Sequence, residues 1–190
     1  SRIMSVAVLV RVRGDVETII LRLSTVCGWS PRMRFDLMVN TITARAVVDG
    51  KIKIVGPSQW RPHIHVQDVA EAFLCAAVDA DPVHARGSIY NVGGESQNFT
   101  VGEVGDKVVA AIPGTTAELV DDADDLRSYR VTFDRIRKDL GFTPKWTVDD
   151  AIAEIRDGLR EGVVRDFTDD IYSNLKWLQR SFGARATATA

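Results

Sequence analysis

The spacing of apolar residues at the start of the chain predicts a helix followed by a buried strand. In Ile3–Val12, the residues Ile3, Ala7 and Val10 recur as on one helix face, although the valines between them would also suit a strand. The next segment, Glu17–Val26, is rich in β-branched and apolar residues, which is typical of a strand buried on both faces of a parallel sheet. A helix leading into such a strand indicates the tail of a doubly wound α/β sheet.

The same periodicities continue through the rest of the chain, with a glycine- and proline-containing loop expected over Cys27–Arg34. Further helices are predicted over Asp36–Val48, Gln67–Val78, Val104–Ile112, Asp134–Leu140, Ala151–Leu159 and Phe167–Ser181. Further strands are predicted over Lys51–Gly56, Arg61–Val66, Gly87–Gly94 and Ala117–Val120. Capping-box spacing marks two helix starts, at Thr100 with Glu103 and at Thr147 with Asp150.

Composition and charge narrow the class of protein. The 190 residues are 45% hydrophobic and 26% charged, as in an ordinary soluble globular protein. A formal net charge of −2 offers no broad cationic field, so we expect no nucleic-acid partner. No apolar run approaches the roughly 18 residues of a membrane helix, so we expect no membrane partner either. Cys27 and Cys75 lack a Cys-x-x-Cys partner and lie in apolar surroundings, which favours buried reduced thiols and a cytoplasmic location.

The first residues open within a helix-like pattern that has no cap and no preceding loop. A natural amino terminus rarely has this pattern. We therefore expect either that Met4 is a start residue or that the chain is the back part of a longer protein.

The stretch from Ser58 to Phe73 places an arginine, two histidines and an aspartate directly before a helix. His63 and His65 are two residues apart and so share one face of a strand. A metal would need at least one further nearby ligand, and His84 belongs to a separate loop, so no metal is expected. His65 is interpreted as a packed strand residue, and Asp68 as a residue that caps or positions the following helix.

Several segments in order then resemble a known family. They are LRLSTVCG, FDLMVN, IVG, RPHIHVQDVAEAF, IYNVGG, FTVGEV and YRVTFDRIRKDLGFTPKW. The chain is similar over roughly Ser1 to Glu161 to the carboxy-terminal half of extended short-chain dehydrogenases/reductases. More narrowly, it resembles the NAD-dependent nucleotide-sugar epimerase/dehydratase group. The resemblance implies the C-terminal part of a doubly wound Rossmann-type α/β fold with a small α/β substrate-binding subdomain.

The resemblance also implies two motifs that should lie upstream, so neither is expected in this chain. One is the glycine-rich turn that places the cofactor pyrophosphate at a helix amino terminus. The other is Tyr-x-x-x-Lys, whose tyrosine acts in proton transfer. Ser1-Arg2 fits the position of the family lysine, so Arg2 is either the replacement for that catalytic lysine or a surface arginine. Arginine differs from lysine in shape and does not deprotonate, so this replacement is not conservative.

The family's ligand contacts map onto several positions. Leu23, Ser24 and Thr25 leave the buried strand where family members meet the nicotinamide and the substrate, and ligands bind at this end of such sheets. Alternatively, these three residues form an ordinary strand end. Asp36 stands where the family often has a substrate-facing asparagine, and beside a diphosphate it would need a partner such as Arg32 or Arg34.

The other substrate contacts are implied in the same way. Asn40 is the alternative to Asp36 as the substrate-facing residue, unless both are helix residues that face solvent. Arg61 corresponds to an arginine that reaches a phosphate of the nucleotide-sugar, a contact suited to a planar guanidinium, and His63 would line the same cleft. A second phosphate-binding arginine is expected in the loop before YRV, at Arg127 or Arg130, although the acidic run there is typical of a solvated face.

Three hypotheses follow for function. The first is the substrate-binding half of an NAD-dependent epimerase, dehydratase or reductase acting on a nucleotide-sugar. NAD(P) would serve the full-length enzyme, and this chain alone would be inactive and would bind the cofactor poorly. The second is a non-enzymatic truncated module that binds a ligand or partner chain, through self-association or a complementing amino-terminal half. The third is a different chemistry without NAD, because fold does not fix function.

The resemblance finally implies a division of the chain. Residues 1–30 would be the remnant of the dinucleotide-binding domain, and residues 31–162 the substrate-binding subdomain interleaved with the sheet. Residues 163–190 would be a peripheral helix and a disordered tail.

Overall fold

The computed structural model describes residues 18–79, 87–121 and 128–186, with side chains described as far as residue 181. The helix predicted over Ile3–Val12 therefore lies outside the described residues. The strands are β1 (Ile20–Leu23), β2 (Thr25–Cys27), β3 (Lys51–Val55), β4 (Trp60–His65), β5 (Ile89–Val92), β6 (Asn98–Thr100) and β7 (Thr116–Val120). The α-helices are α2 (Met38–Asp49), α3 (Val66–Leu74), α5 (Val101–Ala111), α6 (Asp134–Leu140), α7 (Val148–Arg160) and α8 (Asn174–Ala186).

Short helical turns complete the described elements. A π-helical turn, η1 (Cys75–Asp79), continues α3, so the helix predicted over Gln67–Val78 is present but changes its winding near its end. Two 3₁₀ turns, η2 (Glu95–Gln97) and η3 (Asp170–Tyr172), precede β6 and α8. The helix predicted over Phe167–Ser181 is thus present only from Asn174 onward.

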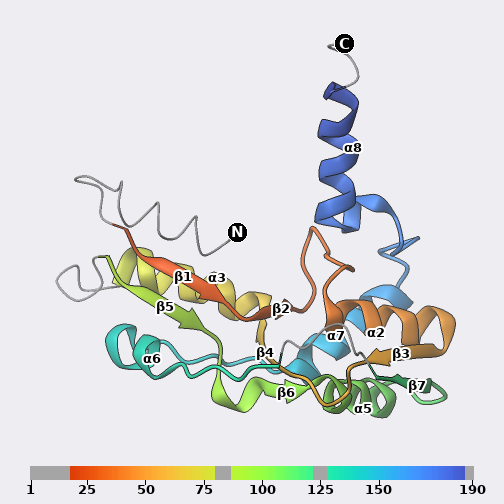
Figure 1. Ribbon diagram of the computed structural model, residues 1–190, viewed down its shortest axis with the longest axis horizontal. Coiled ribbons are helices and arrows are strands. Elements are labelled where there is room, and N and C mark those ends of the chain that lie inside the picture. Colours follow the sequence, from red (N-terminus) through yellow and green to blue (C-terminus); the bar gives the residue numbers. More distant parts are fainter. Residues whose placement is uncertain (1–17, 80–86, 122–127, 187–190) are drawn as a thin grey trace.

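The strands form three small sheets with mostly parallel pairing (Figure 1). β1 pairs with β5, β2 pairs with β4, and β3 pairs with β7, all in parallel. β6 joins the other edge of β4 in antiparallel orientation. Parallel neighbours need crossover connections, and α2, α3 and α5 lie within those connections. The described chain therefore has the layered α/β organisation that the sequence predicts.

The strand predicted over Glu17–Val26 differs from the expectation in two ways. It breaks at Ser24 into β1 and β2, which pair with different strands, and the Ser24 amide donates to the Val92 carbonyl at 3.0 Å. The prediction that it is buried on both faces is wrong, because every residue of β1 is partly or fully exposed and Leu23 keeps 39% of its surface. Among the described strands, β1 has only β5 as a neighbour, and one neighbour cannot cover a central strand.

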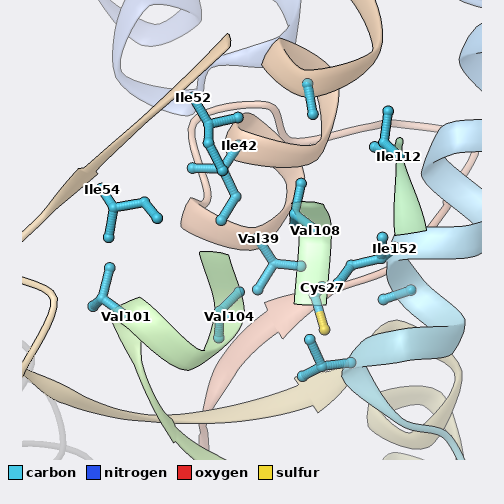
Figure 2. Packing of buried hydrophobic residues seen from close by; sticks show 13 residues of the cluster. Cys27, Val39, Ile42, Ile52, Ile54, Val101, Val104, Val108, Ile112 and Ile152 are labelled. Carbon is cyan, nitrogen blue, oxygen red and sulfur yellow. The ribbon is translucent and has the colours of Figure 1, made fainter. Parts of the chain in front are cut away.

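The largest buried cluster lies between β3 and the helices α2, α5 and α7 (Figure 2). On β3, Ile52 and Ile54 point inward while the residues between them are exposed, as the alternating KIKIV pattern predicts. Gly105 lets α5 approach this strand closely, since a Cβ there would lie 2.1 Å from the Ile54 Cδ1 atom. The cluster fixes α2 and α7 against each other, and these helices support the candidate site.

Helix ends follow the local signals. Both predicted capping boxes are confirmed, at Thr100 with Glu103 before α5 and at Thr147 with Asp150 before α7. Gly50 ends α2 with a φ of 64°, a left-handed conformation that favours glycine. α2 begins at Met38 rather than at Asp36 as predicted, so Asp36 lies in the turn before the helix.

Candidate functional site

A cavity of about 820 Å³ lies where β1 passes into β2. Its wall combines these strands with the loop between β2 and α2. The lining residues are 20–28, Ser30, Arg32, Arg34, Leu37, Asn40, Val66 and Tyr129. The volume is within the range of small-molecule sites, and the wall mixes apolar side chains with a few polar ones.

The strand ends proposed from the sequence lie on this wall. Leu23, Ser24 and Thr25 all line the cavity. Gly93, at the end of the neighbouring β5, leaves space for Ser24, because a Cβ at Gly93 would lie 2.5 Å from the Ser24 Oγ atom. The absence of a side chain at Gly93 therefore allows Ser24 to lie across the end of β5.

A pair of arginines forms the cationic part of the wall. Arg32 and Arg34 line the cavity from the loop before α2. The Arg34 guanidinium donates through Nε and Nη2 to the two carboxylate oxygens of Asp36, at 2.6 and 2.7 Å. Asp36 itself is not a lining residue. The expected pairing of Asp36 with a neighbouring arginine is confirmed, and the partner is Arg34.

The charge of Asp36 is stabilised in this arrangement. Partial burial acts to raise the pKa of Asp36, but the hydrogen bonds and the charge of Arg34 outweigh it and hold the pKa below its ordinary value. Arg34 is thus held by a carboxylate that stays ionised at neutral pH.

Asn40 lies beneath the same loop and is almost fully buried. Its Oδ1 accepts from the Gly28 amide at 3.3 Å, and its Nδ2 donates to the Arg34 carbonyl at 3.0 Å. The Asn40 side chain therefore ties both ends of the loop to α2 while also lining the cavity.

Two further arginines predicted from the sequence lie together near Tyr129. The Arg61 guanidinium stacks over the Tyr129 ring at 5.6 Å, and the Arg130 guanidinium stacks over the Trp60 ring at 4.3 Å. The Tyr129 amide donates to the Trp60 carbonyl at 3.2 Å, which aligns the two segments. Because Tyr129 also lines the cavity, this cluster of two cations and two aromatic rings lies beside it.

His63 does not line the cavity. Its side chain is fully buried, and neither ring nitrogen has a hydrogen-bond partner among the described residues. Burial, with the nearby charge of Arg61 as a smaller cause, lowers the pKa of His63 to about 4. The histidine expected at the cleft is therefore a neutral interior residue, because its strand position points into the protein.

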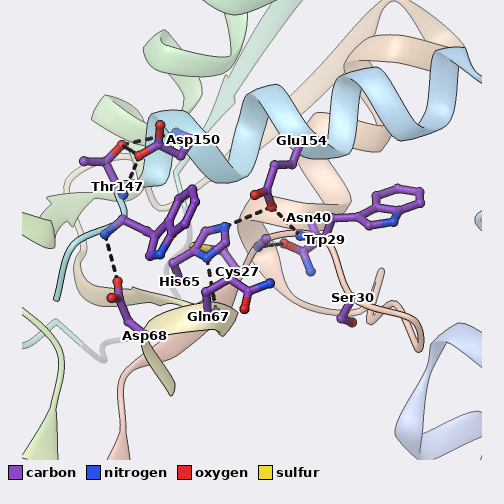
Figure 3. Close-up of polar contacts among 12 residues, drawn as sticks. Cys27, Trp29, Ser30, Asn40, His65, Gln67, Asp68, Thr147, Asp150 and Glu154 are labelled. Atoms are coloured by element: carbon purple, nitrogen blue, oxygen red, sulfur yellow. Dashed lines mark hydrogen bonds and ion pairs between the residues drawn. The ribbon is translucent and has the colours of Figure 1, made fainter. Parts of the chain in front are cut away.

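His65 is also buried, but it is fully engaged (Figure 3). Its Nε2 lies 3.0 Å from Oε2 of Glu154 on α7, and its Nδ1 accepts from the Gln67 amide at 3.2 Å. The ring stacks on Trp146 at 5.3 Å. The packed role expected for His65 is confirmed, and this residue, rather than Asp68, caps α3.

The His65–Glu154 pair is also hydrogen-bonded to the backbone of the cavity loop. The same Glu154 oxygen accepts from the Trp29 amide at 3.0 Å. Gly28 has a φ of 104°, and a Cβ there would lie 2.4 Å from the His65 Nε2 atom, so only glycine fits. Asp68 instead accepts from the amides of Lys145 and Trp146 at 2.8 and 3.0 Å, which positions the segment before α7.

Three of the residues singled out from the sequence lie in parts of the chain that the structure does not describe. Arg2, His84 and Arg127 lie outside the described residues. The Tyr-x-x-x-Lys spacing does occur once in the chain, at Tyr172 and Lys176, contrary to the expectation that it is absent. Tyr172 packs edge-on against Phe35 and Lys176 pairs with Asp170, and neither lines the cavity. Neither side chain of this occurrence therefore belongs to the cavity wall.

Among the described residues, no group of three or more histidine, cysteine, aspartate or glutamate side chains is arranged to hold a metal ion. Within this part of the chain, no helix combines the length and the apolar character needed to cross a membrane. Cys27 and Cys75 are both free, and burial, together with the charges of Glu154 and Asp68, raises the pKa of Cys27 to about 12.

Comparison with known proteins gives a consistent result. The model of the NAD dependent epimerase/dehydratase family matches residues 3–93. UDP-glucose 4-epimerase from Thermus thermophilus, solved with NAD, is 25% identical with a TM-score of 0.65 over 85% of this chain and 51% of that chain. UDP-glucose 4-epimerase from Thermotoga maritima, solved with UDP-glucose, is 21% identical with a TM-score of 0.67 over 85% of this chain and 51% of that chain.

A dehydratase of known structure is similar to this chain to the same degree. The dTDP-glucose 4,6-dehydratase from Bacillus anthracis str. Ames, solved with NAD, is 21% identical with a TM-score of 0.66 over 84% of this chain and 49% of that chain. The chain thus spans about half the length of these solved structures, and their shared fold confirms the predicted Rossmann-type α/β class. The chain resembles the NAD-dependent epimerase/dehydratase family of extended short-chain dehydrogenases/reductases, as its sequence predicts.

Proposed function

We propose that this chain is the substrate-binding part of an NAD(P)-dependent epimerase, dehydratase or reductase that acts on a nucleotide-sugar. The observation that carries the proposal is the cavity of about 820 Å³ at the ends of β1 and β2, with arginines in its wall and beside it. In this proposal residues 31–162 form the substrate-binding subdomain, next to a remnant of the dinucleotide-binding domain over residues 1–30. Residues 163–190 form a separate C-terminal part in this proposal.

The arginine and aromatic cluster supports recognition of a diphosphate. Arg61 and Arg130 would each donate to phosphate oxygens, since a guanidinium presents paired N–H groups in one plane. Their stacking on Tyr129 and Trp60 holds them in place before a ligand arrives. Arg127 stays an alternative to Arg130 as the second phosphate contact.

The neutral part of the wall supports binding of the sugar and the nicotinamide ring. Ser24 and Thr25 offer hydroxyl groups, and Leu23 offers an apolar surface. Asn40 has its amide engaged with the loop backbone, so in this proposal it shapes the cavity floor. Asp36 would act through Arg34 rather than by facing the ligand.

In this proposal the chain contacts only the nicotinamide end of the dinucleotide. The sequence contains no Gly-x-Gly-x-x-Gly turn that would place a pyrophosphate at a helix amino terminus. When bound, NAD(P) supplies the hydride acceptor of the reaction. We therefore propose that the isolated chain is inactive, and that Arg2, if it replaces the family lysine, contributes only in the presence of the cofactor-binding part. The two free cysteines support a cytoplasmic location in this proposal.

Calorimetric titration with UDP-glucose and dTDP-glucose tests the proposal. Arg61→Ala should weaken binding at least about tenfold, because a charge-assisted contact to phosphate is lost. Arg45→Ala is a matched control, because this arginine pairs with Asp49 on α2 and belongs neither to the cavity wall nor to the cluster of Arg61 and Arg130 beside it. Equal affinities of the wild type and Arg61→Ala, or binding of neither nucleotide-sugar, would contradict the proposal.

One observation favours the second candidate, a module that binds a partner chain. β1 is a parallel strand with one described neighbour, and Phe73, Leu74 and Val78 on the adjoining α3 and η1 are 53%, 61% and 75% exposed. Apolar surface next to an unpaired strand edge favours association with another polypeptide. Sedimentation over a range of concentrations separates the two: a stable self-associated species that binds no nucleotide-sugar would favour the module.

A further inference from the structure

The loop that carries the cavity arginines has no regular secondary structure of its own. Residues 28–37 connect β2 to α2 and supply Ser30, Arg32, Arg34 and Leu37 to the cavity wall. A loop of this kind must be held by other parts of the chain if its long side chains are to keep fixed positions. Glu154 on α7 holds the backbone of the first half of the loop, and Asn40 on α2 contacts the backbone of both halves, at Gly28 and Arg34.

The second half of the loop contacts the C-terminal segment, which we define as Asp170–Trp177. The Phe35 amide donates to the Tyr172 carbonyl at 3.1 Å, and the two rings meet edge to face at 5.4 Å. Phe35 is buried in a cluster that also contains Phe167 and has Tyr172 packed against it. This contact brings the first turn of α8 next to the cavity loop, although the rest of α8 projects away from the molecule (Figure 1).

Asn174 links the C-terminal segment to both cavity arginines. Its Oδ1 accepts from Arg32 Nη1 at 2.8 Å. Its backbone amide donates to the Asp36 Oδ2 atom at 3.3 Å, and Asp36 holds Arg34 through two hydrogen bonds. One residue of α8 therefore sets the position of Arg32 directly and that of Arg34 through Asp36.

Trp177 provides a second support for Arg32. The Arg32 guanidinium lies over the Trp177 ring, 5.7 Å from its centroid. Arg32 is otherwise exposed, and a long exposed side chain loses rotamer freedom when it binds a ligand. A side chain that is already held by an amide oxygen and an aromatic ring loses less rotamer freedom on binding, and this smaller entropy loss increases affinity.

We infer that the side chains of Asn174 and Trp177 are positioning groups that hold Arg32 ready for the anionic part of the ligand in the cavity, while the backbone amide of Asn174 supports Arg34 through Asp36. The inference rests on the proposed function, because it assigns the ligand a diphosphate. It extends that function to a segment distant in sequence from the loop, since Arg32 and Asn174 are separated by 142 positions. The C-terminal segment is then part of the binding site rather than a peripheral tail.

Titration of UDP and of uridine tests this role. The double variant Asn174→Ala/Trp177→Ala should bind UDP about fivefold more weakly than the wild type, because Arg32 must be ordered on binding. Its affinity for uridine, which has no phosphate, should not change. The control is Leu175→Ala/Leu178→Ala on the same helix, where the two leucines are 65% and 46% exposed, and it should bind UDP as the wild type does.

A conservative variant separates positioning from general stabilisation of the loop. Trp177→Phe keeps an aromatic ring beneath Arg32 and should bind UDP within about twofold of the wild type. Wild-type affinity of the double variant for UDP, or an equal loss for UDP and uridine, would overturn the inference while leaving the proposed function intact. A wild-type protein that binds neither UDP nor dTDP would instead remove the proposed function, and the inference with it.

Discussion

Two amphipathic helices, α7 and α3, differ in how much of their apolar surface the protein covers. On α7, one face is completely buried, and its residues are Val148, Ala151, Ile152 and Ile155. On α3, Ala72 is fully buried, whereas Phe73 and Leu74 are 53% and 61% exposed. Both helices have apolar residues at helical spacing, so the sequence pattern alone does not distinguish them.

The difference lies in the neighbours of each helix. α7 packs between α2 and α5, and its residues join the clusters around β3 and around Phe35. α3 covers part of the cluster around Tyr90 and Val92, and no described element covers its outer surface. The comparison teaches that stability is concentrated around α7, whereas the region of α3 and β1 has apolar surface available for other contacts.

The largest effect is expected from a cavity made beneath α7. Ile152→Ala should lower the free energy of unfolding by about 3 kcal/mol, because it removes a fully buried side chain from a tightly packed region that relaxes only partly. Urea denaturation of both proteins measures the difference. A loss below about 1 kcal/mol would mean that the packing around α7 is looser than its burial indicates.

Acid should lower the free energy of unfolding through the buried His63. The His63 ring lies 6.4 Å from the ring of Phe99, which packs against the cluster between β3, α2, α5 and α7. The pKa of His63 is lowered from 6.5 to about 4, so below pH 6.5 the unfolded state binds a proton that the folded state does not. Above pH 6.5 His63 is neutral in both states and does not lower the free energy of unfolding. As the pH drops from 6.5 to 4, its protonation in the unfolded state lowers that free energy by up to about 3 kcal/mol.

The matched variant is His63→Phe, which replaces a ring whose nitrogens have no partners among the described residues. Urea denaturation at several pH values should give a shallower decline for the variant between pH 6.5 and 4. Because every other ionisable group is the same in both proteins, the difference between the two profiles isolates His63. Parallel profiles would show that His63 is accessible to protons in the folded state.

Local signals predict much of the architecture around α7. The capping boxes at Thr100 and Thr147 and the alternation of β3 depend on residues a few positions apart, and all three are confirmed. The pairing of Asp36 with a neighbouring arginine is equally local, although the sequence leaves both Arg32 and Arg34 open as the partner and the structure selects Arg34. These features need only the period of a helix or strand and the chemistry of neighbouring side chains.

Contacts between distant residues are not predictable in this way. The bond between His65 and Glu154 joins residues 89 positions apart, and no spacing rule pairs them. The exposure of β1 cannot be predicted from the sequence, because an apolar strand has the same residue pattern whether or not neighbouring strands cover it. The resemblance assigns His63 to the cleft, whereas its orientation on β4 depends on which strands flank it.

A smaller effect is expected at the start of α7. Thr147→Ala removes the hydroxyl that accepts from the Asp150 amide at 3.2 Å and should lower the free energy of unfolding by about 1 kcal/mol. Thr147→Ser retains that acceptor and should remain within about 0.5 kcal/mol of the wild type. Equal losses in the two variants, measured by urea denaturation, would assign the effect to the threonine methyl group rather than to the cap.

The smallest effect is expected on the outer surface of α3. Leu74→Ala should change the free energy of unfolding of the monomer by less than about 0.5 kcal/mol, because the side chain is already mostly in water. Urea denaturation at low protein concentration measures this value, and Ile152→Ala provides the contrasting buried site. A loss above about 1 kcal/mol that grows with protein concentration would mean that Leu74 is buried in an assembly, since association stabilises by mass action. The contrast between α7 and α3 would then reflect an absent partner, and the apolar surface of α3 would belong to an interface rather than to solvent.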